Sequence, residues 1–294
     1  MILAACKSHV TTFLGHMTRF VKIGFSRFLR TSVVFCFLVP GLLLGASASG
    51  AEEQTIAPPP AGIQAFHPGE TLTYNVSWSS VFSAGTVTMT VERSELPEGR
   101  EGLRFVVRGR TQGLVDKVFP VNNAVQSVFD PQLMQSLSYS LRESYGKKKR
   151  LRVTEFDHAK KTAVCRLNED PPVTLTVPDP VQDGLSLLYF LRTKEDLVIG
   201  RRMDIDVVDS GKNWTIEVSI LAREKVATAA GKFDTIKVRT YPKHMGDSVK
   251  KREVFLWLTD DDRKIPVLMK STLKVGSFVF KLVDMKPGAH TFTQ

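Results

Sequence analysis

The stretch that decides the fold is 70-ETLTYNVSW-78, followed closely by 85-GTVTMTVER-93. In the first, every second residue from Leu72 to Trp78 is apolar or aromatic, and the residues between them are polar. In the second, Val87, Met89 and Val91 alternate with threonines in the same way. Because side chains of a strand point alternately to its two faces, this period of two predicts antiparallel strands with one apolar face.

The same alternation recurs along most of the chain, in segments separated by short polar turns. We expect roughly a dozen strands, which at such regular spacing form a large antiparallel sheet. The predicted fold class is therefore mainly β: a single large curved antiparallel sheet or incomplete barrel with one helix near 180–194. The further segments are LRFVVRGRT (103–111), NAVQSVFD (123–130), QSLSYSLRE (135–143), RLRVTEFD (150–157), MDIDVVD (203–209), NWTIEVSIL (213–221), FDTIKVRTY (233–241), REVFLWLT (252–259), IPVLMKSTLKV (265–275) and SFVFKLVDM (277–285).

One segment, PDPVQDGLSLLYFLRT (178–193), follows a helical pattern instead. Asp179 precedes Pro180, which is the order expected of a helix cap and a first helical residue, and Gln182 is placed to complete a capping box. Apolar residues then recur at helical spacing. We expect this helix to lie against the sheet or to plug the mouth of a barrel.

The first 48 residues are typical of an export signal. They carry five basic residues and no acidic one, then the apolar run SVVFCFLVPGLLLG (32–45) and small residues suited to cleavage. The alternative is an N-terminal membrane anchor, and translation could start at Met1 or at Met17. Removing the signal lowers the formal net charge from +10 to +5. Residues 49–65, rich in proline and alanine, predict a flexible tether, and 66–294 a single β-rich domain. The expected location is outside the cytoplasm, in the periplasm of a Gram-negative bacterium.

Three consecutive aspartates, Asp260 to Asp262, raise the question of a metal site. They fall between two predicted strands, where a hairpin must turn, and aspartate is a common turn residue. A calcium loop needs ligands at alternating positions and a distal glutamate, which this stretch lacks. We predict a turn, no metal and no cofactor.

A basic cluster stands at another predicted hairpin tip: Lys147, Lys148, Lys149, Arg150 and Arg152. We interpret it as a solvated surface patch, with binding to an anionic envelope surface as the alternative. The export signal makes a nucleic-acid partner inconsistent with the rest of the chain. The sequence also lacks the common nucleophile, zinc-protease and nucleotide-binding motifs, so we expect no enzyme.

Several phrases together resemble a bacterial family of exported proteins known as domain of unknown function 3108. They are GETLTYNVSW (69–78), AGTVTMTV (84–91), PDPVQDGLS (178–186), GKFDTIKV (231–238) and WLTDDDRKIPV (257–267). The closing hairpin is similar, more loosely, to that of periplasmic lipoprotein carriers, which are open barrels over an apolar cavity. The resemblance implies such a fold and no defined activity.

The leading functional hypothesis is an exported binding protein of the cell envelope, a carrier or chaperone for an acyl chain or another apolar ligand. An apolar ligand needs a concave, mostly apolar pocket. The alternatives are a non-catalytic interaction or scaffold protein with a solid core and, third, an enzyme acting on the cell wall. The expected partners are a lipid or lipoprotein acyl chain and an anionic envelope surface. The candidate cavity-lining residues are Tyr74, Trp78, Met89, Trp214, Phe255 and Trp257.

Overall fold

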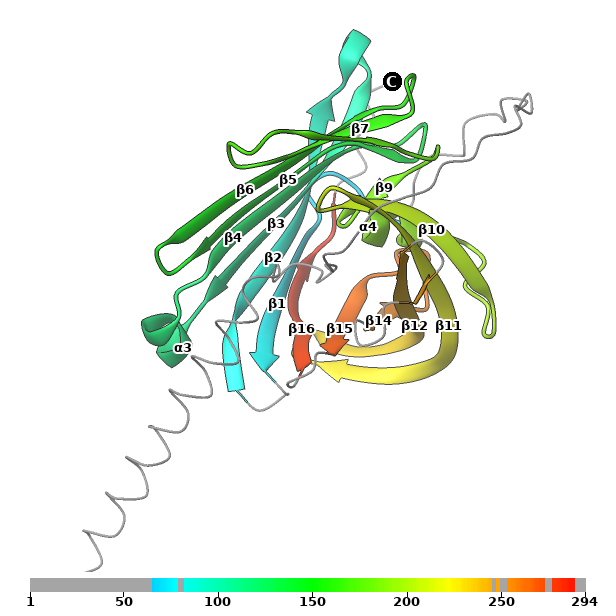
Figure 1. The fold of residues 1–294 in the computed structure, drawn as a ribbon. Helices are drawn as coiled ribbons and strands as arrows, with labels where there is room; N and C mark the ends of the chain where they lie inside the picture. Colours follow the sequence, from blue (N-terminus) through cyan, green and yellow to red (C-terminus); the bar gives the residue numbers. More distant parts are fainter. Residues whose placement is uncertain (1–64, 79–81, 245–246, 249–252, 273–276, 289–294) are drawn as a thin grey trace, which may run out of the picture.

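A computed structural model describes residues 65–78, 82–244, 247–248, 253–272 and 277–288 (Figure 1). The predicted export signal, residues 1–48, and all but the last residue of the predicted tether lie outside this range. Within it, no helix has both the length and the apolar character needed to cross a membrane.

The described chain is almost entirely strand. Besides the strands there are two short α-helices, α3 (Gly113–Val118) and α4 (Ser186–Arg192), and a helical turn at Pro97–Gly99. The strands are β1 (Thr71–Trp78), β2 (Phe82–Glu95), β3 (Glu101–Thr111), β4 (Asn122–Asp130), β5 (Gln135–Tyr145), β6 (Lys148–Asp157), β7 (Thr162–Leu167), β8 (Val173–Thr176), β9 (Gln182–Asp183), β10 (Arg202–Asp209), β11 (Lys212–Thr228), β12 (Gly231–His244), β13 (Asp247–Ser248), β14 (Val254–Thr259), β15 (Pro266–Thr272) and β16 (Ser277–Lys286).

All of these strands belong to one open sheet. Its order is β8-β7-β6-β5-β4-β3-β2-β1-β16-β15-β14-β12-β11-β10-β9, with β13 attached to β12. Neighbours are antiparallel except β9 and β10, which are parallel. Figure 1 shows a flatter half from β2 to β7 and a strongly curled half from β16 to β10. The prediction of a mainly β fold with a curved, unclosed antiparallel sheet is confirmed.

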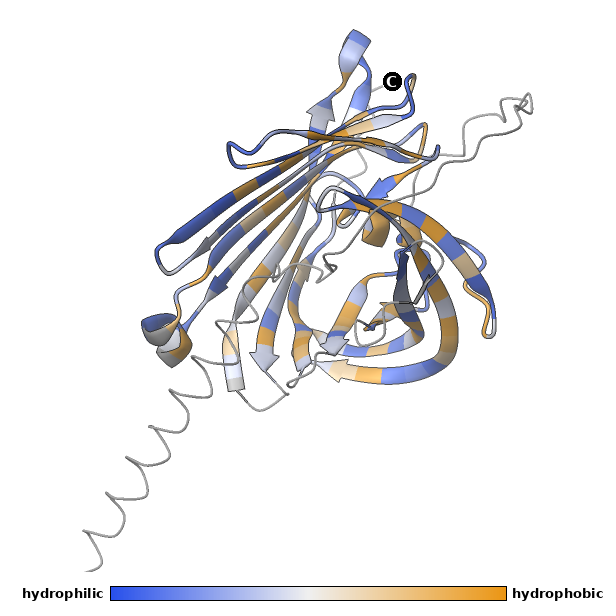
Figure 2. Cartoon of the chain, viewed as in Figure 1, coloured by the Kyte–Doolittle hydropathy of each residue, from blue (hydrophilic) through white to orange (hydrophobic). Residues whose placement is uncertain are grey.

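The alternation read from the sequence sets the two faces of this sheet. Along β1, Leu72, Tyr74 and Val76 are buried while Asn75 is exposed, so one face carries the core. Figure 2 shows the corresponding bands of hydrophobic and hydrophilic residues across the strands. We call the face that carries α4 the inner face and the opposite one the outer face.

Helix α4 packs on the inner face at the centre of the core. The ring of Tyr189 stacks on that of Phe105 in β3, with centroids 3.7 Å apart. Phe66 meets both rings edge-on, at 5.1 Å from Tyr189 and 5.5 Å from Phe105. The helix therefore packs against the inner face of the sheet, as predicted.

The boundaries of the helix differ from the prediction. The helix begins at Ser186 rather than near residue 180, because Gln182 and Asp183 pair as a strand with Val207 and Val208 of β10. The Asp183 carboxylate accepts hydrogen bonds from the backbone N–H groups of Leu185 (2.7 Å) and Ser186 (2.9 Å). Asp183, not Asp179, thus binds the free N–H groups at the start of the helix, since sheet pairing outweighs the local helical pattern of the preceding residues.

Buried polar contacts hold both ends of α4. At its start, the hydroxyls of Ser127 and Ser136 each donate to Asp183 Oδ2 at 2.5 Å. Burial raises the pKa of Asp183, and these serine hydrogen bonds act in the opposite direction. At its end, Arg192 forms a buried ion pair with Glu70 and donates from Nε to the carbonyl of Arg263 at 3.0 Å. The helix is thereby fixed to β4 and β5 at its start, and to the residue before β1 and the β14–β15 turn at its end.

Four of the phrases that resemble a known family gain a structural explanation here. Glu70 belongs to the first phrase and binds Arg192, while Asp183 belongs to the third and caps α4. Tyr74 of the first donates its hydroxyl to the carbonyl of Pro266, in the last phrase, at 2.8 Å. In the second, Gly85 lies so close to β3 that an added Cβ would be 2.1 Å from the carbonyl oxygen of Arg110. These residues position the helix and the strands.

Candidate functional site

The three consecutive aspartates form the predicted turn between β14 and β15. Asp261 Oδ1 accepts from the Thr259 hydroxyl (2.5 Å) and from the backbone N–H groups of Arg263 and Lys264 (both 3.1 Å). Partial burial acts to raise the pKa of Asp261, but the hydrogen bond from Thr259 and the charge of Arg263 outweigh it, so the pKa is lowered. Asp260 pairs instead with Arg223, at 2.6 Å. The carboxylates of Asp260 and Asp261 thus serve local turn and surface contacts.

The basic cluster lies at the tip of the β5–β6 hairpin, but it is not one surface patch. Lys147, Lys148 and Lys149 are exposed. Arg152 is only 9% exposed, contrary to its assignment to the surface. Strand alternation places Arg152 on the inner face, where it lies 3.4 Å from Glu143 and donates to the Ser210 hydroxyl at 3.1 Å. Arg152 thus connects β6 to the turn between β10 and β11.

A carboxylate with a perturbed pKa lies at this connection. Burial raises the pKa of Asp209 to about 6, although the positive charge of Arg152 acts to lower it. Perturbed acids often mark active sites. Here the surrounding groups are themselves engaged, since the Asp209 carbonyl accepts from Trp214 and Arg152 lies against Glu143. No cluster of three or more metal-ligating side chains occurs among the residues the structure describes. We therefore assign Asp209 a structural place at the junction between the two halves of the sheet.

Trp257 belongs to the main hydrophobic core and Phe255 packs against it, and three more of the six predicted lining residues, Tyr74, Met89 and Trp214, lie within the same core. They are 0%, 3% and 2% exposed, respectively. Tyr74 and Trp214 also donate hydrogen bonds to backbone carbonyls. Their side chains fill the core between the sheet and the helix.

Two others, Phe255 and Trp257, lie on the outer face of β14. The neighbouring Leu256 and Leu258 point inward and are buried, so alternation turns Phe255 and Trp257 outward. The Trp257 indole donates to Glu224 Oε2 at 2.8 Å, and the Lys237 ammonium lies 5.1 Å from its ring centroid. Phe255 and Trp257 therefore point away from the inner face of the sheet.

The sixth, Trp78, belongs to a separate apolar cluster at the far end of β1. Its ring meets that of Phe278 edge-on, with centroids 4.7 Å apart. Val76, Ala84 and Phe278 form the buried part of the cluster, with Phe280 packed against it. This places Trp78 apart from the core around α4.

Beside this cluster lies an apolar groove, which we call the rim groove. Its cavity is about 50 Å³, and its main apolar wall residues are Val76, Val87, Phe278 and Phe280. Glu70, which binds the end of α4, precedes Trp78 by eight residues, which is roughly 26 Å along an extended chain. The rim groove therefore lies at the end of β1 away from α4.

Sequence reasoning missed most of the groove residues, although the pattern contains a signal for them. In 277-SFVFK-281, Phe278 and Phe280 are two residues apart and so share a face. Two aromatic residues at a strand end, opposite Trp78 and Val76 of β1, indicate an apolar patch near the rim. Pairing β16 with β1, far away in sequence, was needed to bring them together.

Comparisons with known proteins agree with this fold. Residues 73–283 match the family model described as "Protein of unknown function (DUF3108)". A beta-barrel-like protein of domain of unknown function DUF1849 from Brucella abortus is 12% identical, with a TM-score of 0.52 over 76% of this chain and 100% of that one. That similarity concerns the fold alone.

Two further solved structures are more distant. A "putative exported protein with YmcC-like fold" from Bacteroides fragilis is 14% identical, covering 77% of this chain and 99% of that one, with a TM-score of 0.31. A "putative lipoprotein" from Parabacteroides distasonis is 12% identical, covering 75% and 97%, also with a TM-score of 0.31. No curated protein matches the sequence.

Proposed function

The chain belongs to the DUF3108 family, and from this premise we propose that it is an exported binding protein of the cell envelope that holds an acyl chain at the rim groove. The observation that carries the proposal is an apolar groove at the end of the sheet away from the fixed helix. Apolar ligands bind in concave, mostly apolar sites. The export part rests on the N-terminal sequence, with its basic stretch, short apolar run and small residues.

The contacts around α4 differ from those at the rim groove, and this difference supports a binding role. Around α4 the inner face is held by buried ion pairs and hydrogen bonds, which favour one fixed arrangement. At the rim groove the contacts are apolar side chains, including the half-buried Phe280, and Trp78 packs against the bordering cluster. Apolar contacts are non-directional, so they accept chains of different length more readily than a hydrogen-bonded site does.

The size of the cavity limits how a chain can bind. About 50 Å³ admits only a short part of an acyl chain. The rest of the chain would lie along the mouth of the groove, against Trp78, or displace the edge-on contact between Trp78 and Phe278. The proposal therefore includes a movement of these two rings when the ligand enters.

A matched pair of substitutions tests the site. Phe280→Ser removes an apolar wall of the groove, whereas Phe255→Ser removes a similarly half-buried ring from the outer face of β14. Burying a large apolar side chain contributes about 1.5–3 kcal/mol, so Phe280→Ser should weaken palmitate binding by roughly tenfold or more. Phe255→Ser should leave binding unchanged.

Radiolabelled palmitate binding and native mass spectrometry of both variants give the readout, with circular dichroism as the check on folding. Equal affinities for wild type, Phe280→Ser and Phe255→Ser would refute the groove as the site. Purified wild type that binds no palmitate would instead favour the solid-core interaction protein.

A further inference from the structure

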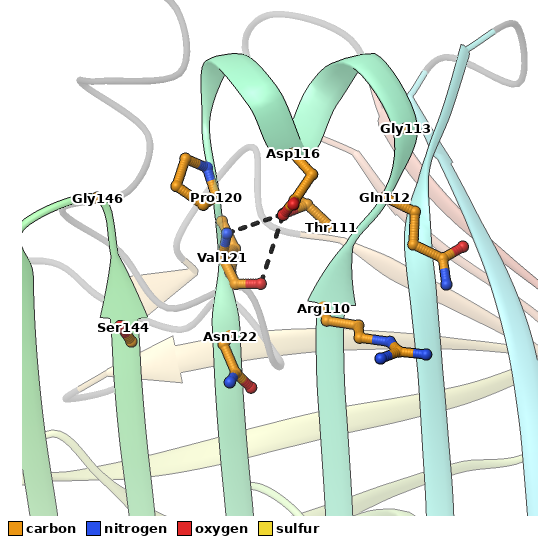
Figure 3. A pocket seen from close by; sticks show the side chains of 10 residues that line it. All are labelled: Arg110, Thr111, Gln112, Gly113, Asp116, Pro120, Val121, Asn122, Ser144 and Gly146. Carbon is orange, nitrogen blue, oxygen red and sulfur yellow. Dashed lines mark hydrogen bonds between the residues drawn. The ribbon is translucent and has the colours of Figure 1, made fainter.

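A second cavity lies on the outer side of the sheet, below α3. It is a cleft of about 540 Å³, and its polar wall includes Arg110, Gln112, Asn122 and Ser144 (Figure 3). Arg110 and Asn122 are paired neighbours on β3 and β4, and Asn122 lies in register with Ser144 on β5 by extension of the pairing from Ala124 and Arg142. Strand pairing thus places Arg110, Asn122 and Ser144 on neighbouring strands, whereas Gln112 follows β3 and donates from its amide to the Thr86 hydroxyl on β2 at 3.3 Å.

The acidic residue of the cleft already has a partner. The Thr111 hydroxyl donates to Asp116 Oδ1 at 2.7 Å, and the backbone N–H of Val121 donates to the same hydroxyl at 2.8 Å. Figure 3 draws the hydrogen bonds to Val121, and together with the bond to Asp116 they tie α3 to the ends of β3 and β4. Asp116 therefore stabilises the frame of the cleft, and Arg110 is left without an ion pair among the described residues.

Two further arginines face the same way. Arg108 precedes Arg110 by two residues, so both project from the outer face, roughly 7 Å apart along the strand. Ala124 pairs with Arg108 on one side and with Arg142 on the other, which places Arg142 on this face as well. All three arginines are exposed, and within the described part of the chain none forms an ion pair.

This pattern contrasts with the rest of the sheet. Most other described arginines lie within 4 Å of a carboxylate: Arg93, Arg100, Arg104, Arg152, Arg166, Arg192, Arg201, Arg223, Arg239 and Arg263. Three adjacent cations without acidic partners repel one another. An anion bound among them would remove this repulsion.

We propose that the cleft below α3 is a binding site for a phosphate group. The planar guanidinium of Arg110 matches two phosphate oxygens, and Asn122 and Ser144 offer neutral donors for the others. Arg108 and Arg142 add positive potential near the cleft. The site goes beyond the proposed acyl-chain function and stands independently of it.

The source of the phosphate follows from the neighbouring cavity. The cleft and the rim groove share the wall residues Arg110, Thr111 and Val121. The groove opens on the inner face, since Val87 pairs with Tyr74, and the cleft opens on the outer face, so a phospholipid would pass around the ends of β3 and β4 to reach both sites. A soluble phosphate ester has the same chemistry at the cleft, so the test includes both.

The test compares Arg110→Gln with Arg202→Gln. Arg202 is also exposed and has no ion pair within the described residues, but it lies on β10, so both variants lose the same charge at different places. The probes are glycerol 3-phosphate by calorimetry, and phosphatidylcholine vesicles with and without phosphatidic acid by co-sedimentation.

Arg110→Gln should weaken binding of the phosphate probe by about tenfold, whereas Arg202→Gln should bind as wild type does. Loss with glycerol 3-phosphate assigns a soluble ester, and loss with phosphatidic acid vesicles alone assigns a lipid headgroup. Equal losses in both variants, or no binding of either probe by wild type, would overturn the proposal. Phe280→Ser should keep phosphate binding, whereas Arg142→Gln, which lies outside the rim groove, should weaken phosphate binding and keep palmitate binding, so the two functions can fail separately.

Discussion

The Arg192 guanidinium and the Glu70 carboxylate, 122 residues apart in sequence, form a buried two-pronged ion pair with N–O distances of 2.7 and 2.8 Å. Arg192 also donates to the Ala65 carbonyl at 2.8 Å. The pair thus joins the end of α4 to the segment that precedes β1. This contact fixes the helix in the core. The rim groove lies at the opposite end of β1, away from this ion pair.

Removing one partner of this ion pair should strongly destabilise the protein. Arg192→Leu leaves the Glu70 charge buried without compensation, and the expected loss is about 3–5 kcal/mol of unfolding free energy. The control is Arg223→Leu, which breaks the half-exposed pair with Asp260 and should change stability by less than about 1 kcal/mol. Urea denaturation of both variants measures the difference, and similar losses would contradict the structural role of the Arg192–Glu70 pair.

The turn between β14 and β15 should depend on Asp261 far more than on Asp262. Asp261→Ala removes the acceptor of three hydrogen bonds, and we expect a loss of about 1–2 kcal/mol. Asp262→Ala, at an exposed position of the same turn, should stay within about 0.5 kcal/mol. Thermal unfolding with and without added calcium checks both points. A calcium-dependent rise in melting temperature that disappears in Asp261→Ala would contradict the turn assignment.

Trp257 should contribute through its outer-face contacts. Trp257→Phe keeps an aromatic ring but removes the hydrogen bond to Glu224, with an expected loss of about 1 kcal/mol. Trp257→Ala also removes the packed ring, and the expected loss is about 3–5 kcal/mol. Denaturant unfolding distinguishes the two, and equal losses would mean that the ring contributes nothing beyond its hydrogen bond.

Asp209 should make stability depend on pH. Its pKa is raised to about 6 in the folded protein, above the usual 3.8, so the folded state binds this proton more tightly than the unfolded state. Its contribution is therefore fully present below about pH 4 and is lost as the pH rises through 6. Asp209→Asn should remove a fall of about 3 kcal/mol between pH 4 and 7, the size that follows from pKa values of 3.8 in the unfolded and about 6 in the folded protein. Unfolding curves at several pH values test this, and an unchanged pH profile in Asp209→Asn would contradict it.

The sheet could be predicted from the sequence because the alternation of apolar and polar residues that marks a strand is a local pattern. Alternation along β1 and β2 is set by neighbouring residues, and the aspartate turn follows from side chains that bond to their own backbone. Both were therefore found without a structure. The helix was placed correctly in the core, but its start was misplaced because the pairing of Gln182 and Asp183 with β10 is not visible in local sequence.

The site was harder to predict for the same physical reason. Trp78 was named as a lining residue, but its partner Phe278 is 200 positions away, and only the pairing of β1 with β16 brings the two together. Arg152 carries the same charge as its exposed neighbours, and only strand alternation combined with the opposing β10–β11 turn shows that it points inward. Long-range pairing decides which alternating residues share a site.

The most direct test of the account is whether Trp78 contacts a bound acyl chain. Of the three tryptophans, Trp78 packs against the apolar cluster that borders the rim groove, so stearate carrying a nitroxide should quench fluorescence saturably in wild type. We predict that Trp78→Phe abolishes this quenching and that Trp257→Phe, on the outer face, retains it. Absence of saturable quenching in folded wild type, or quenching that survives Trp78→Phe unchanged, would contradict acyl-chain binding at the rim groove.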